Sequence, residues 1–511
     1  MSNRYAELDN RRAELQAGGG PEKLAKQHAA SKLSARERLG QLFTPSSFVE
    51  FGLWVKHHCP ELAAQAYPGD GVITGQGLVD GRSVVAFSQD FTVGGGAVGE
   101  MHAAKIVECL KTALKCGVPV VGFNDGGGAR IQEGVAALSG YGQIFYHNTL
   151  LSGVVPQISV IAGPCAGGAA YSPALTDFVI MVQGTAHMFI AGPEVIRAAT
   201  GEEISEDALG GAQAHAQLAG NIHFVAADER QAVSIVKQLL GYLPQNNLES
   251  PPEVPWKHAL TDAPELDDMI PEDPRKAYDI KEVIARLVDN HSFLEVQREF
   301  APNIVVGFAR LAGMAVGLVA NQPAVLSGVL DIHASDKAAR FVRTCNVYNI
   351  PLVTLVDVPG FLPGVAQEHG GIIRHGAKML FAYSASTVPK LTVILRKAYG
   401  GAYIAMCSRD LGADMVLAWP TAEIAVMGPE GAARVLYRRE LDKASDRPAL
   451  LKEKIDAYRK QHANPFRAAE AFHVDDVIRP ASTRRLLCQR LSMLRAKRDL
   501  RPQKKHGNLP L

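Results

Sequence analysis

The sequence has no excess of either charge. Its 53 Lys and Arg residues face 52 Asp and Glu residues, which leaves a formal net charge of +1 over 511 residues. Without a basic or acidic surplus, we expect neither nucleic acid nor a membrane as a partner. Hydrophobic residues make up 47% of the chain and charged residues 21%, which is typical of folded domains with large cores.

The chain also lacks paired cysteines. Its seven cysteines are scattered, odd in number and never spaced as Cys-x-x-Cys. This pattern argues against a disulfide framework and against a zinc ribbon, so we predict a reducing compartment and no metal site.

A third feature that the sequence lacks is a long apolar segment of the kind that targets or anchors a chain. The N-terminal residues MSNRYAELDNRRAEL have no apolar signal core, and no transit peptide is evident. We therefore expect a cytoplasmic protein, or one of the mitochondrial matrix if the source is eukaryotic. Residues 148–176 carry no charge, but prolines, glycines and Gln157 interrupt them, which favours buried strand and turn over a membrane span.

One stretch, ISVIAGPCAGGAAYSPALTD at positions 158–177, has the pattern of a functional turn. A short apolar run predicts a buried strand, and Gly163-Pro164 and Gly167-Gly168 then predict a tight turn that opens a helix. Helix N-termini bind anions because their first N–H groups have no partner within the helix. The turn could therefore hold a phosphate or an oxyanion, or its glycines could only let the helix pack on the sheet.

The pattern occurs twice. Pro119 and Asp125 are repeated as Pro351 and Asp357 at an offset of 232 residues, and Gly167-Gly168 is repeated as Gly400-Gly401 at an offset of 233. Such a long period excludes a solenoid and indicates a duplicated domain. Seven prolines between residues 243 and 274 indicate a linker, so we predict two domains, residues 1–250 and 251–511.

Strands and helices alternate along both halves, which predicts an α/β fold. In the first half we expect strands near residues 48–54, 71–79, 83–88 and 118–123, and helices over about 100–116 and up to 151. Residues 34–37 (SARE) fit a capping box. The tail from Arg479 is rich in Arg and Lys, and we expect an exposed or subunit-facing helix there.

The whole length of the chain resembles the carboxyltransferase (β) subunit of the biotin-dependent acyl-CoA carboxylases, of the propionyl-CoA and acetyl-CoA carboxylase type. The motifs that carry the resemblance are SARER at 34–38, FVE at 48–50, NDGGGARIQEG at 124–134, GPCAGGAAYSPA at 163–174, DVPGF at 357–361, GGIIRHGAK at 370–378, KAYGGAY at 397–403 and KHGN at 505–508.

The resemblance implies two duplicated crotonase-like (ββα-superhelix) domains. It implies that Gly167 and Gly168 hold the acyl-CoA thioester and that Gly401 and Ala402 hold the biotin carbonyl, as two backbone oxyanion holes. The transfer moves a carboxyl group from carboxybiotin to the α-carbon of a short-chain acyl-CoA. Each of the two developing oxygens needs donors. In this family, biotin itself is thought to remove the α-proton, and neither glycine pair is accompanied by an evident side-chain base.

The resemblance also implies a set of residues that contact the CoA thioester or biotin: Gly95, Gly96, Gly127, Gly128, Ala129, Tyr171, Pro359, Gly360, Phe361, Gly400 and Ile404. Members selective for propionyl groups often have an acidic residue at the position of Ile404. An apolar residue there leads us to expect relaxed choice among short acyl chains.

Two absent motifs define the expected partners. No Met-Lys-Met sequence is present for covalent biotin; Ala377-Lys378-Met379 is nearest and lacks the preceding methionine. No glycine-rich ATP-binding loop of Walker type is present either. We therefore expect biotin, and its ATP-dependent carboxylation, on a biotin carboxylase/biotin carrier (α) subunit. The family's members are usually homohexamers whose active site lies between protomers.

Three alternatives stay open. The chain could belong to a methylmalonyl-CoA decarboxylase or a transcarboxylase, which share these motifs and differ in the overall reaction. A scaffold that binds CoA without turnover is disfavoured because both glycine pairs are intact. A hydratase or hydrolase would need an acid or base beside one pair.

Several side chains allow both a structural and a functional interpretation. We expect Cys165 to be a small buried residue, not a nucleophile, since no paired base is evident. Arg130 and Glu133 are expected to pair and fix their loop. Arg374, His375 and Lys378 could face phosphates or solvent, and Arg36 and Arg38 could contact the phosphates of CoA.

Overall fold

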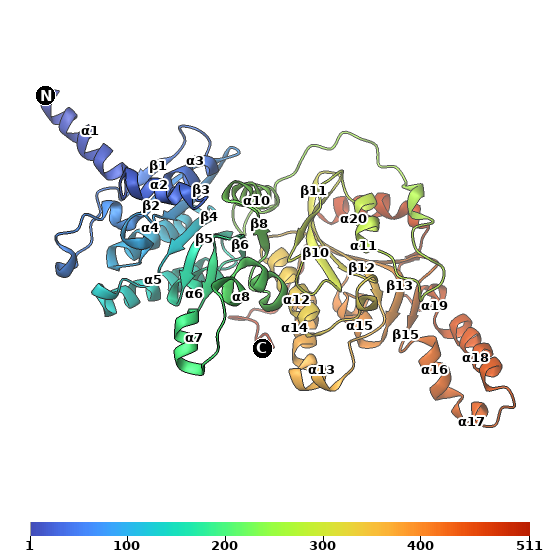
Figure 1. Ribbon diagram of the computed structural model, residues 1–511. Helices are drawn as coiled ribbons and strands as arrows, with labels where there is room; N and C mark the ends of the chain where they lie inside the picture. Colours follow the sequence, from blue (N-terminus) through green and yellow to red (C-terminus); the bar gives the residue numbers. More distant parts are fainter. Residues whose placement is uncertain (1, 511) are drawn as a thin grey trace. The chain divides into compact units, whose positions relative to one another are not determined.

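The computed structural model describes residues 2–510, and its chain divides into two compact units, Met1–Ser250 and Pro251–Leu511 (Figure 1). The strands of the first unit are β1 (Val49–Phe51), β2 (Val72–Val79), β3 (Arg82–Gln89), β4 (Val120–Gly126), β5 (Gln157–Ala166), β6 (Phe178–Val182), β7 (His187–Phe189) and β8 (Phe224–Ala226). Its helices are α1 (Ser2–Gln16), α2 (Pro21–Ala29), α3 (Ala35–Leu42), α4 (Glu100–Cys116), α5 (Val135–Leu151), α6 (Gly168–Ala174), α7 (Pro193–Thr200), α8 (Glu206–Gly210), α9 (Ala212–Ala214) and α10 (Glu229–Tyr242).

The second unit contains the same series of strands. They are β9 (Leu294–Val296), β10 (Ile304–Leu311), β11 (Met314–Asn321), β12 (Leu352–Val358), β13 (Lys390–Tyr399), β14 (Met415–Ala418), β15 (Glu423–Ala425) and β16 (Asp476–Val477). Its helices are α11 (Ile280–Leu287), α12 (Ile332–Val347), α13 (Val365–Gly370), α14 (Ile372–Ala385), α15 (Gly400–Ala405), α16 (Pro429–Leu436), α17 (Arg438–Leu441), α18 (Arg447–His462), α19 (Pro465–Glu470) and α20 (Thr483–Leu494).

Both sheets have one topology. The first has the order β1-β2-β3-β4-β5-β6-β8, with β7 paired to the end of β5, and the second has the order β9-β10-β11-β12-β13-β14-β16, with β15 paired to β13. In each sheet the first two pairings are antiparallel and the rest are parallel. The prediction of a duplicated α/β fold is confirmed at this level.

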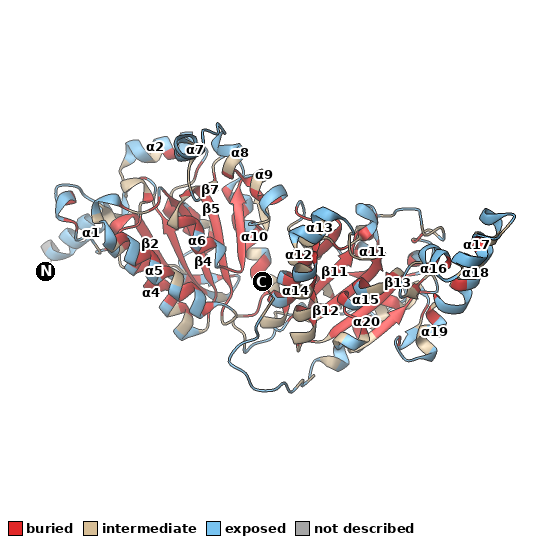
Figure 2. Ribbon diagram, turned by 90° about the horizontal axis from the view of Figure 1, so that it is seen from below, coloured by how far each residue is buried: buried red, intermediate tan, exposed pale blue. Residues whose placement is uncertain are grey.

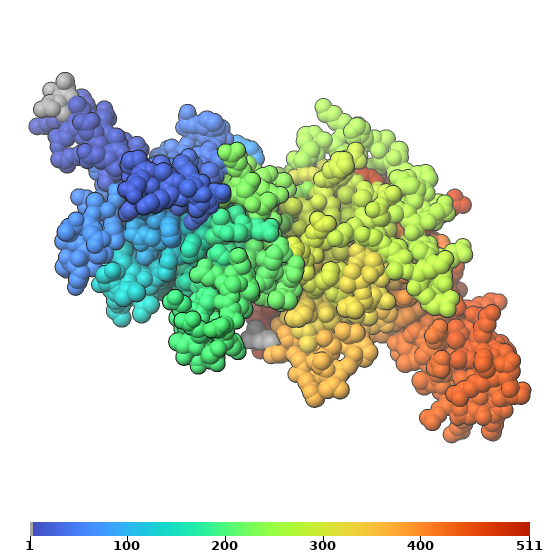
Figure 3. Space-filling model, in the orientation of Figure 1, coloured from blue at the N-terminus to red at the C-terminus, as the bar shows by residue number. Residues whose placement is uncertain are grey.

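Burial explains why the central strands are continuous apolar runs. All residues of β6 and β11 are buried, as are the first seven residues of β5 and of β13. Parallel strands covered by helices on both faces need such sequences, and Figure 2 shows the strands as buried and the outer sides of the helices as exposed. Figure 3 shows that α16–α18 extend from the body of the second unit.

The duplication extends to single side chains. Lys105 on α4 and Lys337 on α12 are 232 residues apart, and both are buried. The Lys105 ammonium donates to the Gly69 carbonyl at 2.7 Å, and the Lys337 ammonium donates to the Ile304 carbonyl at 2.8 Å. Each lysine thus satisfies a carbonyl group at or just before the start of an equivalent strand, where an unpaired carbonyl would be costly.

The turns after β3 and β11 also match. Gly94, Gly95 and Gly96 have φ values of 58°, 65° and 64°, and Leu326, Ser327 and Gly328 have 47°, 55° and 75°. Two residues with side chains therefore adopt the left-handed conformation in the second unit, which costs each roughly 1–2 kcal/mol. The backbone shape is the same although two of the three glycines are absent.

Predicted and observed elements agree in most places. Ser34 caps α3 in a capping box with Glu37, and α4 spans the residues expected. The tail helix α20 was expected to be exposed or subunit-facing, but one of its faces is buried: Leu487, Cys488 and Leu491 lie in the core of the second unit. Apolar residues three to four positions apart form that buried face.

Candidate functional site

Two equivalent glycine turns lie at the carboxyl ends of β5 and β13. Gly167 has a φ of 61° and Gly400 a φ of 59°, so each turn needs a residue that tolerates the left-handed region. The turns lead directly into the short helices α6 and α15. The Gly167 N–H donates to the Phe189 carbonyl of β7 at 2.9 Å, and this bond extends the β5–β7 ladder.

The second glycine of each pair has a different reason to lack a side chain. Gly168 and Gly401 have no left-handed φ. A Cβ added to Gly401 would have no atom within 4 Å, and one added to Gly168 would meet the Tyr141 ring at 3.4 Å, an ordinary contact. Glycine is therefore required at neither position, by backbone conformation or by packing within the chain. The space beside Gly401 is open, and that beside Gly168 is bordered by the Tyr141 ring at ordinary contact distance, so both backbones leave room for a closely approaching ligand.

These open glycines, Gly168 and Gly401, are the first residue of α6 and the second residue of α15. The first N–H groups of a helix have no partner within the helix. By the offset of 233 residues, Gly168 and Ala169 correspond to Gly401 and Ala402. Ala169 was not among the predicted site residues, although the same offset applied to Ala402 would have found it. Since the N–H of Gly167 is already bound to Phe189, Gly167 forms the turn and is not free to donate.

A second loop lies beside each turn. The Val98 N–H donates to the Gly128 carbonyl at 2.8 Å, and the Leu330 N–H donates to the Gly360 carbonyl at 3.1 Å. Parallel bridges join Val98 to Ala129 and Leu330 to Phe361. The predicted residues Gly127, Gly128 and Ala129, and their counterparts Pro359, Gly360 and Phe361, therefore occupy equivalent loops after β4 and β12.

The predicted residues Gly95 and Gly96 pack against the loop that follows β4. The Gly127 N–H donates to the Gly95 carbonyl at 3.1 Å. A Cβ on Gly96 would lie 2.2 Å from the Asp125 carbonyl oxygen, so glycine is required there by packing alone.

Tyr171 and Ile404 occupy equivalent positions, each three residues after an open glycine. Their side chains are 52% and 39% exposed, and the Tyr171 ring packs edge-on against Phe145 with centroids 6.2 Å apart. Both side chains can therefore line a site above the turn without being required by the core.

The titratable groups next to the turns do not form a catalytic dyad. Burial raises the pKa of Cys165 to about 12, and its thiol donates to the Ala169 carbonyl at 3.2 Å. As predicted, Cys165 is a small buried residue. In the second unit, burial and then Glu423 raise the pKa of Tyr399, and the Tyr399 hydroxyl is hydrogen-bonded to that carboxylate.

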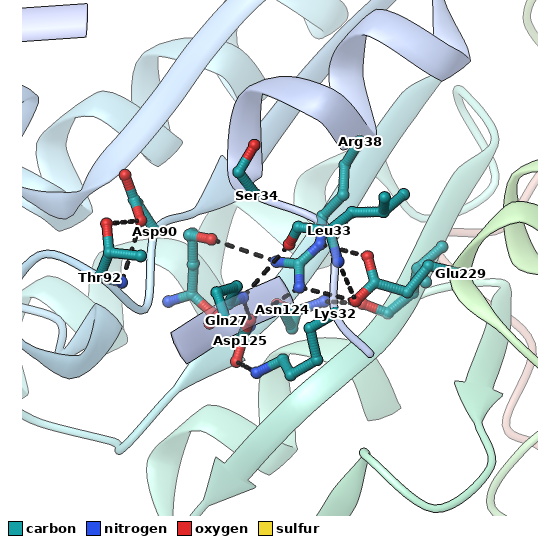
Figure 4. Close-up of polar contacts among 12 residues, drawn as sticks. Gln27, Lys32, Leu33, Ser34, Arg38, Asp90, Thr92, Asn124, Asp125 and Glu229 are labelled. Carbon is teal, nitrogen blue, oxygen red and sulfur yellow. Dashed lines mark hydrogen bonds and ion pairs between the residues drawn. The ribbon is translucent and has the colours of Figure 1, made fainter. Parts of the chain in front are cut away.

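A buried ionic cluster lies at the end of β4 (Figure 4). Asp125, which is fully buried, accepts from the Lys32 ammonium at 2.6 Å and from the Arg38 guanidinium at 2.8 Å. Arg38 also forms a bidentate pair with Glu229 at 2.6 and 2.9 Å. Burial alone would lower the pKa of Arg38, but the charges of Asp125 and Glu229 raise it.

The equivalent carboxylate in the second unit is neutralised in another way. Asp357 accepts from the Arg396 guanidinium at 3.0 Å and from the Tyr278 hydroxyl at 2.9 Å. Burial raises the pKa of Asp357, against the opposing effect of Arg396. Gly163 occupies the position in the first unit that Arg396 occupies in the second, and a Cβ there would lie 1.9 Å from Asp125 Oδ1.

The remaining charged residues named from the sequence are paired. Arg130 contacts Glu133 at 2.7 Å and Asp70 at 2.8 Å, which confirms its structural pairing. Arg36 is bound to Glu50 through both terminal nitrogens.

For Arg38 the structure excludes the alternative of a phosphate contact, because its side chain is fully buried against Asp125 and Glu229. On the surface of α14, His375 and Lys378 share Asp336 at 2.7 and 2.9 Å.

Within residues 2–510, no group of three or more His, Cys, Asp or Glu side chains is arranged to hold a metal ion. Over the same residues, no helix has both the length and the apolar composition needed to cross a membrane.

The repeated sheets and turns define a crotonase-like α/β protein with two equivalent sites. Residues 26–509 match the model of the carboxyl transferase domain, and the chain therefore belongs to the carboxyl transferase family. The predictions of its family, its fold class and its being an enzyme are confirmed.

The chain is similar to relatives that differ in overall reaction. It is 56% identical to the methylmalonyl-CoA carboxyltransferase 12S subunit of Propionibacterium freudenreichii subsp. shermanii, over 100% of this chain and 98% of the relative. It is 53% identical to the methylmalonyl-CoA decarboxylase subunit alpha of Propionigenium modestum (100% and 99%). It is also 53% identical to the propionyl-CoA carboxylase beta chain of Saccharopolyspora erythraea (100% and 96%).

The chain is also similar to solved structures of carboxyltransferases. The crystal structure of a transcarboxylase 12S hexamer with methylmalonyl-coenzyme A and methylmalonic acid bound matches with a TM-score of 0.98 and 56% identity, over 100% of this chain and 98% of that one. A single-chain, multi-domain long-chain acyl-CoA carboxylase matches with a TM-score of 0.84 and 31% identity, over 96% of this chain and 48% of that one.

The two glycines of one turn should respond differently to alanine. Gly400→Ala places a side chain at a φ of 59°, with Cβ 3.0 Å from the Val426 carbonyl oxygen, and should destabilise the second unit by about 1–2 kcal/mol. Gly401→Ala adds a methyl group to open space and should leave stability unchanged. Thermal unfolding midpoints of the two variants measure this difference, and a loss in Gly401→Ala equal to that in Gly400→Ala would contradict it.

Proposed function

We propose that the chain transfers a carboxyl group between carboxybiotin on a separate carrier subunit and the α-carbon of a short-chain acyl-CoA such as propionyl-CoA or acetyl-CoA. The observation that carries this proposal is the pair of open glycines, Gly168 and Gly401, at equivalent turns. A transfer between two carbonyl compounds develops negative charge on two oxygens, and two equivalent donor sites match that need.

The first unit would bind the thioester and the second the biotin ureido group. The N–H groups of Gly168 and Ala169 would donate to the thioester oxygen as it becomes enolate-like, and those of Gly401 and Ala402 to the ureido oxygen. Biotin, when bound, supplies the nitrogen that carries the carboxyl group. Donors fixed in a folded backbone need no reorganisation during the reaction, and loss of one typically costs about 3–4 kcal/mol of barrier.

The flanking residues would then orient the two compounds. Gly127, Gly128 and Ala129 would form the wall of the acyl-CoA site, and Pro359, Gly360 and Phe361 that of the biotin site. Tyr171 and Ile404 would border the reacting groups from the two helices. The Cys165 thiol, with its pKa of about 12 and its bond to Ala169, is unsuited to act as a base.

Relatives named as decarboxylase and transcarboxylase subunits, at 53–56% identity, support a second candidate in which the same half-reaction serves a methylmalonyl-CoA decarboxylase or a transcarboxylase. Both candidates use the same sites.

We also propose a homo-oligomer, as in the 12S hexamer. Large apolar side chains are exposed on elements of both units: Ile131, Val135, Leu138, Val365, Ile373, Val426, Val435 and Leu436.

The dependence on a carrier can be tested with the purified chain. With ATP and bicarbonate alone it should carboxylate no acyl-CoA, because the sequence has no glycine-rich ATP-binding loop of Walker type. With free biotin and methylmalonyl-CoA it should release propionyl-CoA slowly, and tethering the biotin should raise the rate through effective concentration. Covalent biotin on this chain, or ATP hydrolysis by it, would refute the proposal that a separate subunit carries and carboxylates the biotin.

The assignment of the two sites can be tested with matched variants. Gly168→Val should raise the KM for methylmalonyl-CoA at least tenfold, since its side chain enters the space above the first turn, and Gly401→Val should do the same for free biotin. Gly142→Val, at an exposed helical glycine with no atom near its Cβ, is the control. If both turn variants impair only acyl-CoA use, the assignment of the second site is wrong.

The choice of acyl chain should depend on Ile404. One methylene group in an apolar pocket is worth only about 1–3 kcal/mol, so the wild type should accept acetyl, propionyl and butyryl groups with kcat/KM values within about a hundredfold of one another. Ile404→Asp should narrow this range, because a carboxylate beside the pocket disfavours longer apolar chains. Strict selectivity in the wild type that the substitution leaves unchanged would show that Ile404 does not form the pocket.

A further inference from the structure

The cluster around Asp125 is electrically balanced and closed to water. It holds two carboxylates, Asp125 and Glu229, and two cations, Lys32 and Arg38, and all four side chains are at least nine-tenths buried. A buried charge without a partner is costly, so the cluster tolerates the loss of one member only if another charge is lost with it.

Asp125 lies next to the parts of the chain that lead into the proposed acyl-CoA site. It directly precedes Gly126, and its N–H donates to Gln89 at 2.9 Å. A Cβ on Gly163 would overlap its Oδ1 at 1.9 Å, so the carboxylate lies against β5 four residues before Gly167. Any shift of this carboxylate moves the glycine loop after β4 or presses on the strand that leads to the turn.

The cations come from outside the sheet. Lys32 follows α2, and Arg38 lies on α3. Gln27 of α2 adds a hydrogen bond to Asp125 at 3.2 Å. In the second unit the corresponding cation, Arg396, belongs to β13 itself. The first unit therefore depends on its N-terminal segment for a charge that the second unit carries within its sheet.

We propose that Lys32 is a positioning residue of the acyl-CoA site, acting through Asp125 on the Gly126–Gly128 loop and on the turn at Gly167. The inference rests on the proposed function of the first unit. Lys32 is better suited to this role than Arg38, because Arg38 is shared with Glu229, whereas the ammonium of Lys32 has Asp125 as its carboxylate partner and lies 4.7 Å from the Phe91 ring centroid.

Loss of the Lys32 charge should make substrate binding depend on pH. The groups that face Asp125 would then be Arg38, Glu229 beyond it, the amides of Gln27 and Gln89, and the Cys165 thiol. Behind Gln89, burial lowers the pKa of His102 to about 3, so that imidazole stays neutral. One carboxylate would be unpaired and would take up a proton at low pH, which restores balance, and release it as the pH rises.

The test compares Lys32→Met, Asp125→Asn and the double variant, with the binding of propionyl-CoA measured by calorimetry in the absence of biotin. Lys32→Met should weaken binding about tenfold more at pH 9 than at pH 6, while the wild type changes little. The double variant keeps only the Arg38–Glu229 pair, is balanced again, and should bind within about threefold of the wild type at both pH values. Lys281→Met, which removes a lysine that is 32% exposed and paired with Glu295 in the second unit, is the control.

Equal binding by the wild type and Lys32→Met at both pH values would overturn the proposal, and so would a double variant no better than Lys32→Met. If Lys32→Met cannot be purified, the double variant is compared with Asp125→Asn, which carries one excess positive charge. The double variant must then bind more tightly, and equal binding overturns the proposal.

Turnover of methylmalonyl-CoA with free biotin separates this inference from the function it rests on. If the wild type binds propionyl-CoA but shows no turnover, the proposed reaction is refuted. The comparison of propionyl-CoA binding between the wild type and the variants then still tests the role of Lys32. A wild type that does not bind propionyl-CoA refutes both. The KM for free biotin should be the same in Lys32→Met as in the wild type. If this KM rises by the same factor as propionyl-CoA binding weakens, the substitution has caused a general loss of structure and the proposal is overturned.

Discussion

A carboxylate removed from water must be paired with a cation or lose its charge, and this constraint acts at the same place in both units. Asp125 and Asp357 are the penultimate residues of the equivalent central strands β4 and β12, and the glycine-bearing loops follow these strands directly. The loops have few side chains of their own with which to hold their position. The first loop is held by backbone hydrogen bonds to Gly95 and Val98, and the carboxylate that precedes each loop is held by its cations.

The two units meet this constraint differently because one strand position differs. Arg396 on β13 reaches Asp357 from within the sheet, whereas Gly163 at the corresponding point of β5 leaves room for Lys32 and Arg38. The duplication has thus kept the backbone and the buried anion and exchanged the source of positive charge. The turns after β3 and β11 show the same behaviour, since Leu326 and Ser327 keep a left-handed shape that glycines adopt in the first unit.

The sequence was sufficient to predict the features that repeat. Apolar runs and glycine pairs at constant offsets gave the duplicated α/β fold, most strand positions and the two turns. The sequence alone was not sufficient to predict features that depend on contacts between residues far apart in the chain. Nothing local shows that Arg38 is buried against Asp125, 87 residues away, and Glu229, 191 residues away. For the same reason it could not show that Gly167 has its N–H bound to Phe189, or that α20 has a buried face.

The open space at Gly168 and Gly401 has a consequence for how such an enzyme changes over time. Peptide N–H groups are common to every residue except proline, so drift among side chains leaves this kind of donor in place. Side chains such as those of Tyr171 and Ile404 are exposed and do not belong to the core, so they can be replaced without loss of the backbone donors. A lineage built in this way can acquire a new partner or a new acyl group while its chemistry stays constant. Relatives named for carboxylation, decarboxylation and transcarboxylation at nearly equal distance from this chain are the outcome that such a division would produce.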